Sequence, residues 1–163
     1  MKTICLLAFI LLFTSPFLAF SQTQKVYNPK ADATAEVKKA IDLAQKNGKH
    51  VFLQIGGNWC PWCIKFHNFV TADSEIATYL KQNFEVVKIN YDRENQQKEL
   101  LEKLEFPQRF GFPVFVILNS LGNRIHTQNS AFLEKDKDYD RNTVLRFLKN
   151  WSPTAVNPES YKK

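Results

Sequence analysis

The sequence predicts an α/β fold in which helices cover both faces of a central mixed β-sheet. Short apolar runs with the character of buried strands alternate along the chain with segments whose apolar residues recur at helical spacing. Alternation of this kind is typical of a sheet packed between two helical layers. The last two predicted strands are separated only by a short turn, which predicts an antiparallel hairpin at one edge of the sheet.

In the first half of the chain, the predicted order is helix, strand, helix, helix. A helix is expected over residues 31–47, because its apolar residues form one stripe and Gly48 follows it, where helices commonly end. Residues 51–55 are an apolar run bounded by glycines and are predicted to be a buried strand. Two further helices are expected over residues 63–70 and 73–80, the second capped by its first residue, an aspartate.

In the second half, strands and helices alternate again before a closing helix. Apolar runs predict the strands, and charged amphipathic segments predict the helices. The expected elements are a strand over 84–90, a helix over 95–104, a strand over 113–118, a returning strand over 124–127 and a helix over 140–151.

The two ends of the chain are predicted to lie outside the domain. Residues 1–21 have the lysine, apolar run and small residues of a secretory signal peptide, so we expect cleavage after Ser21 and export. The apolar run is short for a membrane span, and membrane attachment is expected only if the signal stays uncleaved. Residues 22–30 are predicted to be a loose arm, residues 31–151 the domain and residues 152–163 a polar tail.

The composition indicates a single compact domain and does not indicate nucleic-acid binding. The chain has 163 residues with 14 phenylalanines and 3 tryptophans, enough for a packed core. Its net charge is +6, but the basic residues are spread among acidic ones and form no basic stripe. Nucleic-acid binding is therefore not expected. We expect a monomer that needs no cofactor.

The cysteines single out one short motif, GNWCPWC, over residues 57–63. The chain has 3 cysteines, and Cys5 lies inside the predicted signal peptide. The exported protein would keep only Cys60 and Cys63, in a compartment where disulfides persist. This local pair could be a structural staple, part of a metal site or a redox centre.

The staple and metal hypotheses each have a physical weakness. A disulfide that closes a four-residue loop is expected to stabilise the fold by only about 2 kcal/mol. A structural zinc site needs four ligands, and the motif supplies two. His67 could share a helical face with Cys63, so a copper site of Cys60, Cys63 and His67 stays an alternative. His50 and His126 have no recognisable ligand spacing.

The redox hypothesis uses the position of the pair at the start of a helix. The unpaired N–H groups and the positive end of the helix dipole favour a thiolate there. Cys60 is predicted to be the exposed nucleophile and Cys63 the resolving thiol, while Pro61 suits the first helical turn. Trp59 and Trp62 could form a flat apolar surface for a peptide-like substrate, or could be partly buried in the core.

Three features in order resemble the thioredoxin superfamily over residues 31–151. The strand VFLQI leads into WCPWC at a helix start, VVKINYD over residues 86–92 is similar to the family's central strand, and Gly111-Phe112-Pro113 is similar to its cis-proline loop. The resemblance implies a thioredoxin fold, with Phe112 and Pro113 in substrate binding. Residues 58–83 are most similar to exported bacterial thioredoxin-like proteins, such as the C-terminal domain of the membrane thiol reductant transporter. The resemblance therefore suggests a bacterial periplasm, although secretion stays open.

Two departures from that family affect the predicted chemistry. Gln54 replaces a buried acid that accepts a proton from the resolving cysteine, and Lys88 matches the lysine that partners this acid. An amide cannot act as a base, so slower resolution of mixed disulfides is expected.

The resemblance predicts an exported thiol–disulfide oxidoreductase that acts on protein thiols and disulfides with a redox partner protein. The uncharged Trp62 favours a reductase or isomerase over a strong oxidase, because a histidine at that position would stabilise the reduced thiolate. A copper-binding metallochaperone-like protein and a non-catalytic binding module are the alternatives.

Overall fold

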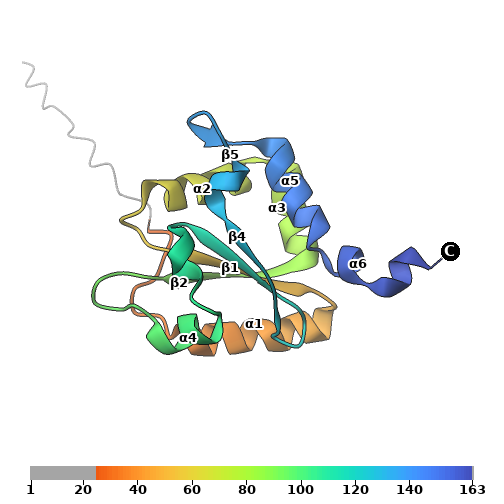
Figure 1. The fold of residues 1–163 in the computed structure, drawn as a ribbon, viewed down its shortest axis with the longest axis horizontal. Coiled ribbons are helices and arrows are strands. Elements are labelled where there is room, and N and C mark those ends of the chain that lie inside the picture. The colour runs from red at the N-terminus through yellow and green to blue at the C-terminus, as the bar shows by residue number, and fades with distance from the viewer. Residues whose placement is uncertain (1–24, 163) are drawn as a thin grey trace, which may run out of the picture.

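The computed structural model describes residues 25–162, which form a mixed four-stranded sheet between two layers of helices (Figure 1). The α/β class predicted from the sequence is confirmed. The predicted signal peptide over residues 1–21, its cleavage site and the first residues of the predicted arm lie outside the described residues. Within residues 25–162, no helix has the length and apolar character needed to span a membrane.

The sheet has the strand order β2-β1-β3-β4. Its strands are β1 (His50–Gly56), β2 (Phe84–Asn90), β3 (Val114–Leu118) and β4 (Arg124–Asn129). The central strand β1 pairs in parallel with β2 and antiparallel with β3, and β3 pairs antiparallel with β4. The predicted hairpin at one edge is therefore confirmed. A second, two-stranded sheet joins β5 (Glu134–Lys135) and β6 (Asp138–Tyr139).

The helices divide between the two faces of the main sheet, with α1 and α4 on one face and α2, α3 and α5 on the other (Figure 1). The helices and 3₁₀ turns are α1 (Ala33–Asn47), α2 (Pro61–Ala72), α3 (Ser74–Asn83), α4 (Lys98–Lys103), η1 (Pro107–Phe110), η2 (Ser130–Leu133), α5 (Arg141–Asn150), α6 (Pro153–Val156) and η3 (Pro158–Tyr161). Aspartates cap the starts of α1, α3 and α5 by accepting backbone N–H groups.

Two apolar cores result from the alternation of side chains along the strands. On β1, Val51, Leu53 and Ile55 pack against α1, whereas Phe52 packs in the core beneath α2, α3 and α5. By the same alternation Gln54 lies on the face of Phe52, although every residue of β1 is buried. A buried polar side chain in an apolar layer requires hydrogen-bond partners, and those of Gln54 lie at the candidate site.

Several observed bounds differ from the predicted ones, and three of the differences concern α2, α4 and the C-terminal tail. The helix α2 begins at Pro61, two residues before the predicted start. The helix α4 begins at Lys98 rather than at residue 95, because the Asp92 carboxylate accepts the N–H groups of Glu94 and Asn95 and holds them in a turn. The predicted polar tail contains α6 and η3, and Ser152 caps α6.

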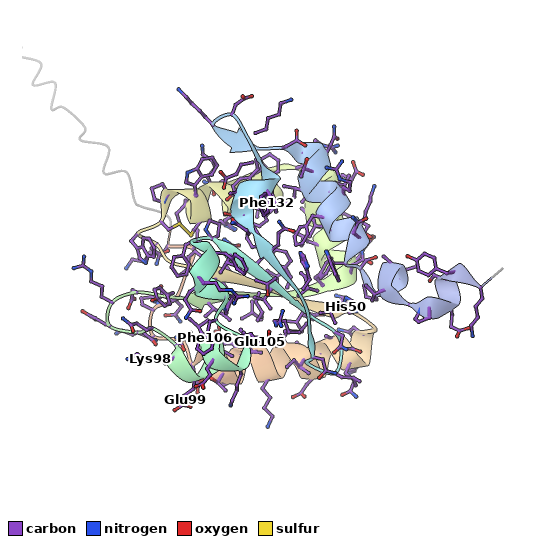
Figure 2. All side chains as sticks on the ribbon, in the orientation of Figure 1. His50, Lys98, Glu99, Glu105, Phe106 and Phe132 are labelled. Atoms are coloured by element: carbon purple, nitrogen blue, oxygen red, sulfur yellow. A yellow bond between two sulfur atoms is a disulfide. The ribbon has the colours of Figure 1, made fainter. Side chains whose placement is uncertain are left out.

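His50 and His126 are explained by packing at the end of the sheet far from the cysteine pair. His50 is the first residue of β1 and lies beside the junction of α5 and α6 (Figure 2), where its Nδ1 is 2.8 Å from the carbonyl oxygen of Trp151. His126 stacks on the Trp151 ring at a centroid distance of 4.1 Å. Both side chains therefore pack against Trp151, the residue that ends α5.

Replacing Phe115 by alanine is expected to destabilise the protein strongly. Its ring is fully buried, with ring centroids 4.2 Å from Phe66 and 5.3 Å from Phe52. Phe115→Ala should therefore lower the free energy of unfolding by about 3–5 kcal/mol, measured by urea denaturation. Phe132→Ala is the control, because that side chain is 74% exposed on η2 (Figure 2), and a change within about 0.5 kcal/mol is expected. Equal losses in the two variants would contradict the core assignment.

Candidate active site

The cysteine pair lies where β1 passes into α2. The strand ends at Gly56, three residues form the connecting turn, and Cys60 is the N-cap of α2. Cys60 and Cys63 form a disulfide with their Cα atoms 5.2 Å apart. Pro61 occupies the first helical turn, where its missing N–H leaves no backbone hydrogen bond unmade.

The start of α2 provides an electrostatic setting that favours a thiolate. The backbone N–H of Cys63 points at the Cys60 sulfur, with N and Sγ 3.2 Å apart. Unpaired N–H groups and the positive end of the helix dipole both stabilise negative charge at this position. When the disulfide is reduced, Cys60 is therefore placed to carry the charge of an attacking sulfur.

Both sulfur-bearing residues are buried in the disulfide form. Cys63 is fully buried and Cys60 is only 4% exposed, so the prediction of an exposed Cys60 is wrong for this state. The cover comes from Tyr27 and from the partly buried side chains of Trp62 and Phe112, which pack against the pair. Attack on a substrate therefore requires the substrate to reach the sulfur past this apolar cover.

Behind the pair, the Gln54 side chain joins two parts of the site. Its Nε2 donates to the Tyr27 hydroxyl at 2.7 Å and to the carbonyl oxygen of Cys63 at 3.1 Å. Gln54 thus satisfies a carbonyl in the first turn of α2 and fixes the orientation of the tyrosine. It can donate hydrogen bonds in this position but cannot accept the proton of Cys63.

Tyr27 belongs to the segment predicted to be a loose arm, and for this residue that prediction is wrong. Its side chain is 2% exposed and clusters with Cys60 and Cys63. The Asn58 side chain holds the arm: its Oδ1 accepts the N–H groups of Val26 at 2.9 Å and Tyr27 at 3.0 Å, and its Nδ2 donates to the carbonyl of Tyr27 at 2.8 Å. Val26 and Tyr27 are held against the domain because an active-site amide satisfies their backbone groups.

Lys88 lies beside Gln54 on the neighbouring strand, as the two residues are register partners in β1 and β2. Burial lowers the pKa of the Lys88 ammonium group. Burial, and secondarily the Lys88 charge, lower the pKa of His67 on α2. The positive charge of Lys88 therefore acts on α2, where His67 lies one turn beyond Cys63.

The structure does not assemble the alternative copper site. Within residues 25–162, no group of three or more histidine, cysteine, aspartate or glutamate side chains is arranged to hold a metal ion. Cys60, Cys63 and His67 therefore do not converge as a ligand set in this form of the protein.

Aromatic side chains and the predicted cis-proline loop line the outer side of the pair. The Phe112–Pro113 peptide bond is cis, as the family resemblance implies. Trp59 is 55% exposed, its indole N–H donates to the Tyr91 carbonyl at 2.7 Å, and its ring meets Phe112 edge-to-face at 5.6 Å. Phe112 also packs on the Tyr91 ring at 4.6 Å.

A groove of about 810 Å³ opens beside the exposed Trp59 ring. The segment that follows β2 forms much of its lining, together with one residue of the N-terminal arm. Its lining residues are Pro29, Trp59, Tyr91, Asp92, Arg93, Glu94 and Gln96.

Trp62 has a more structural setting than Trp59. It is partly buried, its ring meets Tyr139 edge-to-face at 5.4 Å, and its carbonyl accepts the Tyr139 hydroxyl at 3.2 Å. The Lys65 ammonium nitrogen lies 4.5 Å from the centre of the Trp62 ring. Trp62 is partly buried, as one of its two predicted roles requires, while Trp59 keeps an exposed apolar face. Substrate binding by either ring stays a prediction.

A disulfide-forming pair at the start of α2, beside a cis-proline loop and on a sheet of order β2-β1-β3-β4, defines the thioredoxin fold. A family model described as thioredoxin-like matches residues 32–120, and the chain belongs to this family. Among solved structures, it is similar to a disulphide isomerase from Xylella fastidiosa Temecula1, with a TM-score of 0.70, 26% identity and coverage of 79% of this chain and 98% of the other. A thioredoxin from Thermus thermophilus matches with a TM-score of 0.52 and 25% identity over 69% of this chain and 81% of the other.

Two curated relatives match parts of the chain. The disulfide bond reductase DsbH of Chlamydia pneumoniae is 23% identical over 93 residues, which cover 53% of this chain and 56% of DsbH. Human spermatogenesis-associated protein 20 is 34% identical over 82 residues, which cover 50% of this chain and 10% of that protein. The chain thus spans about half of one relative and a tenth of the other.

Sequence reasoning missed four residues that build the site: Gly56, Asn58, Tyr27 and Tyr91. The first two lie within or next to the glycine-rich turn that precedes the cysteines, so their position in the sequence was a usable signal. Tyr27 is an isolated aromatic residue in a polar segment, and nothing around it indicates burial. Tyr91 directly follows a predicted strand, and its carbonyl oxygen accepts the Trp59 indole N–H only in the folded protein.

Replacing Gly56 by alanine is expected to disturb the cysteine pair through direct contact. A Cβ at this position would lie inside contact distance of Cys63 Sγ and 3.0 Å from the Tyr27 hydroxyl oxygen. Gly56→Ala should lower the free energy of unfolding of the oxidised protein by about 1–3 kcal/mol, measured by urea denaturation.

A double-mutant cycle identifies the cause of that loss. In a Cys63→Ala background the Gly56→Ala penalty should shrink, because the nearest atom has been removed. Gly48→Ala is the backbone control: its φ of 64° is strained for alanine but no atom lies within 4 Å, so its cost should not depend on Cys63. A Gly56→Ala penalty of equal size in both backgrounds would contradict the close approach.

Proposed function

We propose that this protein is a thiol–disulfide oxidoreductase that reduces or isomerises disulfides in protein substrates. The observation that carries the proposal is the Cys60–Cys63 disulfide, with Cys60 at the N-cap of α2 and Cys63 enclosed behind it. The similarity to proteins named as a disulphide isomerase and a disulfide bond reductase supports the same chemistry.

The reaction requires two exchanges at one sulfur. The Cys60 thiolate attacks a substrate disulfide, a Cys60–substrate S–S bond forms, and the second substrate sulfur leaves as a thiolate that takes a proton from water. Cys63 then loses its proton to solvent and attacks the Cys60 sulfur, which forms the Cys60–Cys63 disulfide and releases the other substrate thiolate. The substrate gains two electrons and the protein dithiol loses two.

The surroundings of the pair support a reductase or isomerase over a strong oxidase. Strong oxidation needs a reduced form stabilised well beyond the effect of the helix start. Trp62, between the cysteines, is uncharged and partly buried against Tyr139, so it contributes no such stabilisation. The Gln54 amide donates to the Cys63 carbonyl and cannot act as a base for the Cys63 proton. Mixed disulfides are therefore predicted to be resolved more slowly than in proteins that have a buried acid at this position.

Export and partners extend the proposal. The predicted signal peptide over residues 1–21 would deliver the protein to the periplasm or outside the cell, where protein disulfides form and persist. The free face of Trp59 and the adjoining groove offer an apolar surface for an unfolded or peptide-like chain. Continued reduction would need a redox partner protein that returns electrons to the Cys60–Cys63 disulfide.

A redox titration in glutathione buffers, with bound copper measured on the same samples, tests the proposal. We expect reversible two-electron oxidation of Cys60 and Cys63 with a midpoint between about −270 and −180 mV, the range of thioredoxin and protein disulfide isomerase. A Cys60→Ser/Cys63→Ser double variant is the control and should show no transition.

Three results would contradict the proposal, each in a different way. A midpoint near about −120 mV would indicate a strong oxidase. Stoichiometric copper on the reduced protein would favour the metallochaperone alternative, and a disulfide that glutathione cannot reduce would favour a non-catalytic binding module.

A further inference from the structure

Tyr27 is a buried tyrosine that reaches the enclosed cysteine from outside the matched family region. The family model begins at residue 32, and Tyr27 precedes it. Its side chain nevertheless forms one apolar cluster with Cys60 and Cys63. Its hydroxyl is thus a polar group placed among sulfur atoms and apolar side chains, where hydrogen bonds are strong and few.

Two observations place the hydroxyl near the Cys63 side chain. Gln54 Nε2 donates to it at 2.7 Å and, with its other proton, to the Cys63 carbonyl at 3.1 Å. The hydroxyl oxygen and Cys63 Sγ also crowd the same point above Gly56, where an added Cβ would meet both atoms. Because Gly56 has no side chain, both groups can occupy this space.

The arm that carries Tyr27 is fixed to the active-site turn. Three hydrogen bonds join the Asn58 amide to the backbone of Val26 and Tyr27. Asn58 lies two residues before Cys60 in the chain, so the turn that presents the nucleophile also positions the tyrosine.

The chemistry of the hydroxyl suits a donor rather than a base. Burial raises the pKa of Tyr27, so the group keeps its proton at neutral pH. Its oxygen already accepts from Gln54, which leaves the O–H free to point at another acceptor. A thiolate forming at Cys63 is an acceptor of the kind that a neutral hydroxyl stabilises.

Other titratable groups approach the pair from the elements packed around it. Lys88 of β2 lies beside Gln54, His67 lies one turn beyond Cys63 on α2, and Tyr139 of β6 donates to the Trp62 carbonyl. Cys60 is bonded to Cys63 itself. Tyr27 is distinguished from these groups by sharing the space above Gly56 with the Cys63 sulfur.

We propose that Tyr27 is a positioning residue for the resolving step, whose hydroxyl donates a hydrogen bond to the Cys63 sulfur as that sulfur becomes a thiolate. This inference rests on the proposed function. In the step, the Cys63 S–H proton goes to solvent, the Cys63 thiolate attacks Cys60, and the substrate thiolate leaves with the electron pair of the broken S–S bond. Tyr27 keeps its proton throughout and is neither the nucleophile nor the leaving group.

The first test measures the Cys63 thiol directly, without any activity. In a Cys60→Ser background, the Cβ chemical shift of isotope-labelled Cys63 is followed against pH with Tyr27 and with Tyr27→Phe. We expect Tyr27→Phe to raise the titration midpoint of Cys63 by about one pH unit, the effect of losing one hydrogen bond to a charged group. Tyr139→Phe is the matched control, because it removes another buried hydroxyl that touches α2, and it should leave the midpoint unchanged.

The second test follows the resolving step in the protein with both cysteines. Tyr27→Phe should slow resolution of a Cys60 mixed disulfide with glutathione about threefold at neutral pH, because a tenfold loss of thiolate is partly offset by its higher nucleophilicity. Above both midpoints, the variant should match or exceed the wild-type rate. Asn58→Ala, which frees the arm without removing the hydroxyl, should shift the profile in the same direction.

Two results would overturn the role of Tyr27: an unchanged Cys63 midpoint in Tyr27→Phe, or an equal shift in Tyr139→Phe. A raised midpoint in a protein whose cysteine pair does not cycle in glutathione would support the hydrogen bond and contradict the proposed function.

Discussion

The close approach of β1 to the first turn of α2 is the contact on which the rest of the site depends. Gly56 has no side chain, so the Cys63 sulfur can lie against the strand, and Gln54 on the same strand reaches the Cys63 carbonyl. Because β1 is the central strand, with β2 on one side and β3 on the other, its position is set by the whole sheet. The cysteine pair is therefore held by a strand that is paired on both sides.

The same contact gives the two cysteines different surroundings. Cys63 is enclosed between the strand, the helix and Tyr27, whereas Cys60 lies at the helix start beneath Phe112 and Trp62. The cis-proline loop and the exposed Trp59 lie on the outer side of the pair. This arrangement fits a site in which one sulfur meets the substrate and the other meets only its neighbour.

Much of this structure could be predicted from local pattern. The strand β3 is a continuous apolar run, β1 and β2 are apolar runs with few polar residues, and the hairpin to β4 follows from a short turn, so the layer order was accessible from the sequence. The pairing of Cys60 with Cys63 follows from their spacing at a helix start. These features depend on residues close together in the chain, where periodicity and turn residues carry the information.

The features that could not be predicted depend on contacts between distant segments. Burial of Cys60 comes partly from Phe112, far along the chain, and burial of Tyr27 depends on hydrogen bonds from Asn58 and Gln54. A polar arm with one tyrosine has no periodic pattern, so it was predicted to be loose. Its order arises because the amides of two active-site residues satisfy its polar groups, which is a property of the folded protein alone.

Trapping a mixed disulfide shows most directly which cysteine attacks the substrate and which one resolves the mixed disulfide. Reduced Cys63→Ser and Cys60→Ser variants would be mixed with insulin and analysed by mass spectrometry without reduction. If Cys60 attacks and Cys63 resolves, Cys63→Ser should accumulate a stable mixed disulfide with an insulin chain through Cys60, while Cys60→Ser should accumulate almost none. Equal accumulation in the two variants, or trapping by Cys60→Ser alone, would contradict the assigned roles.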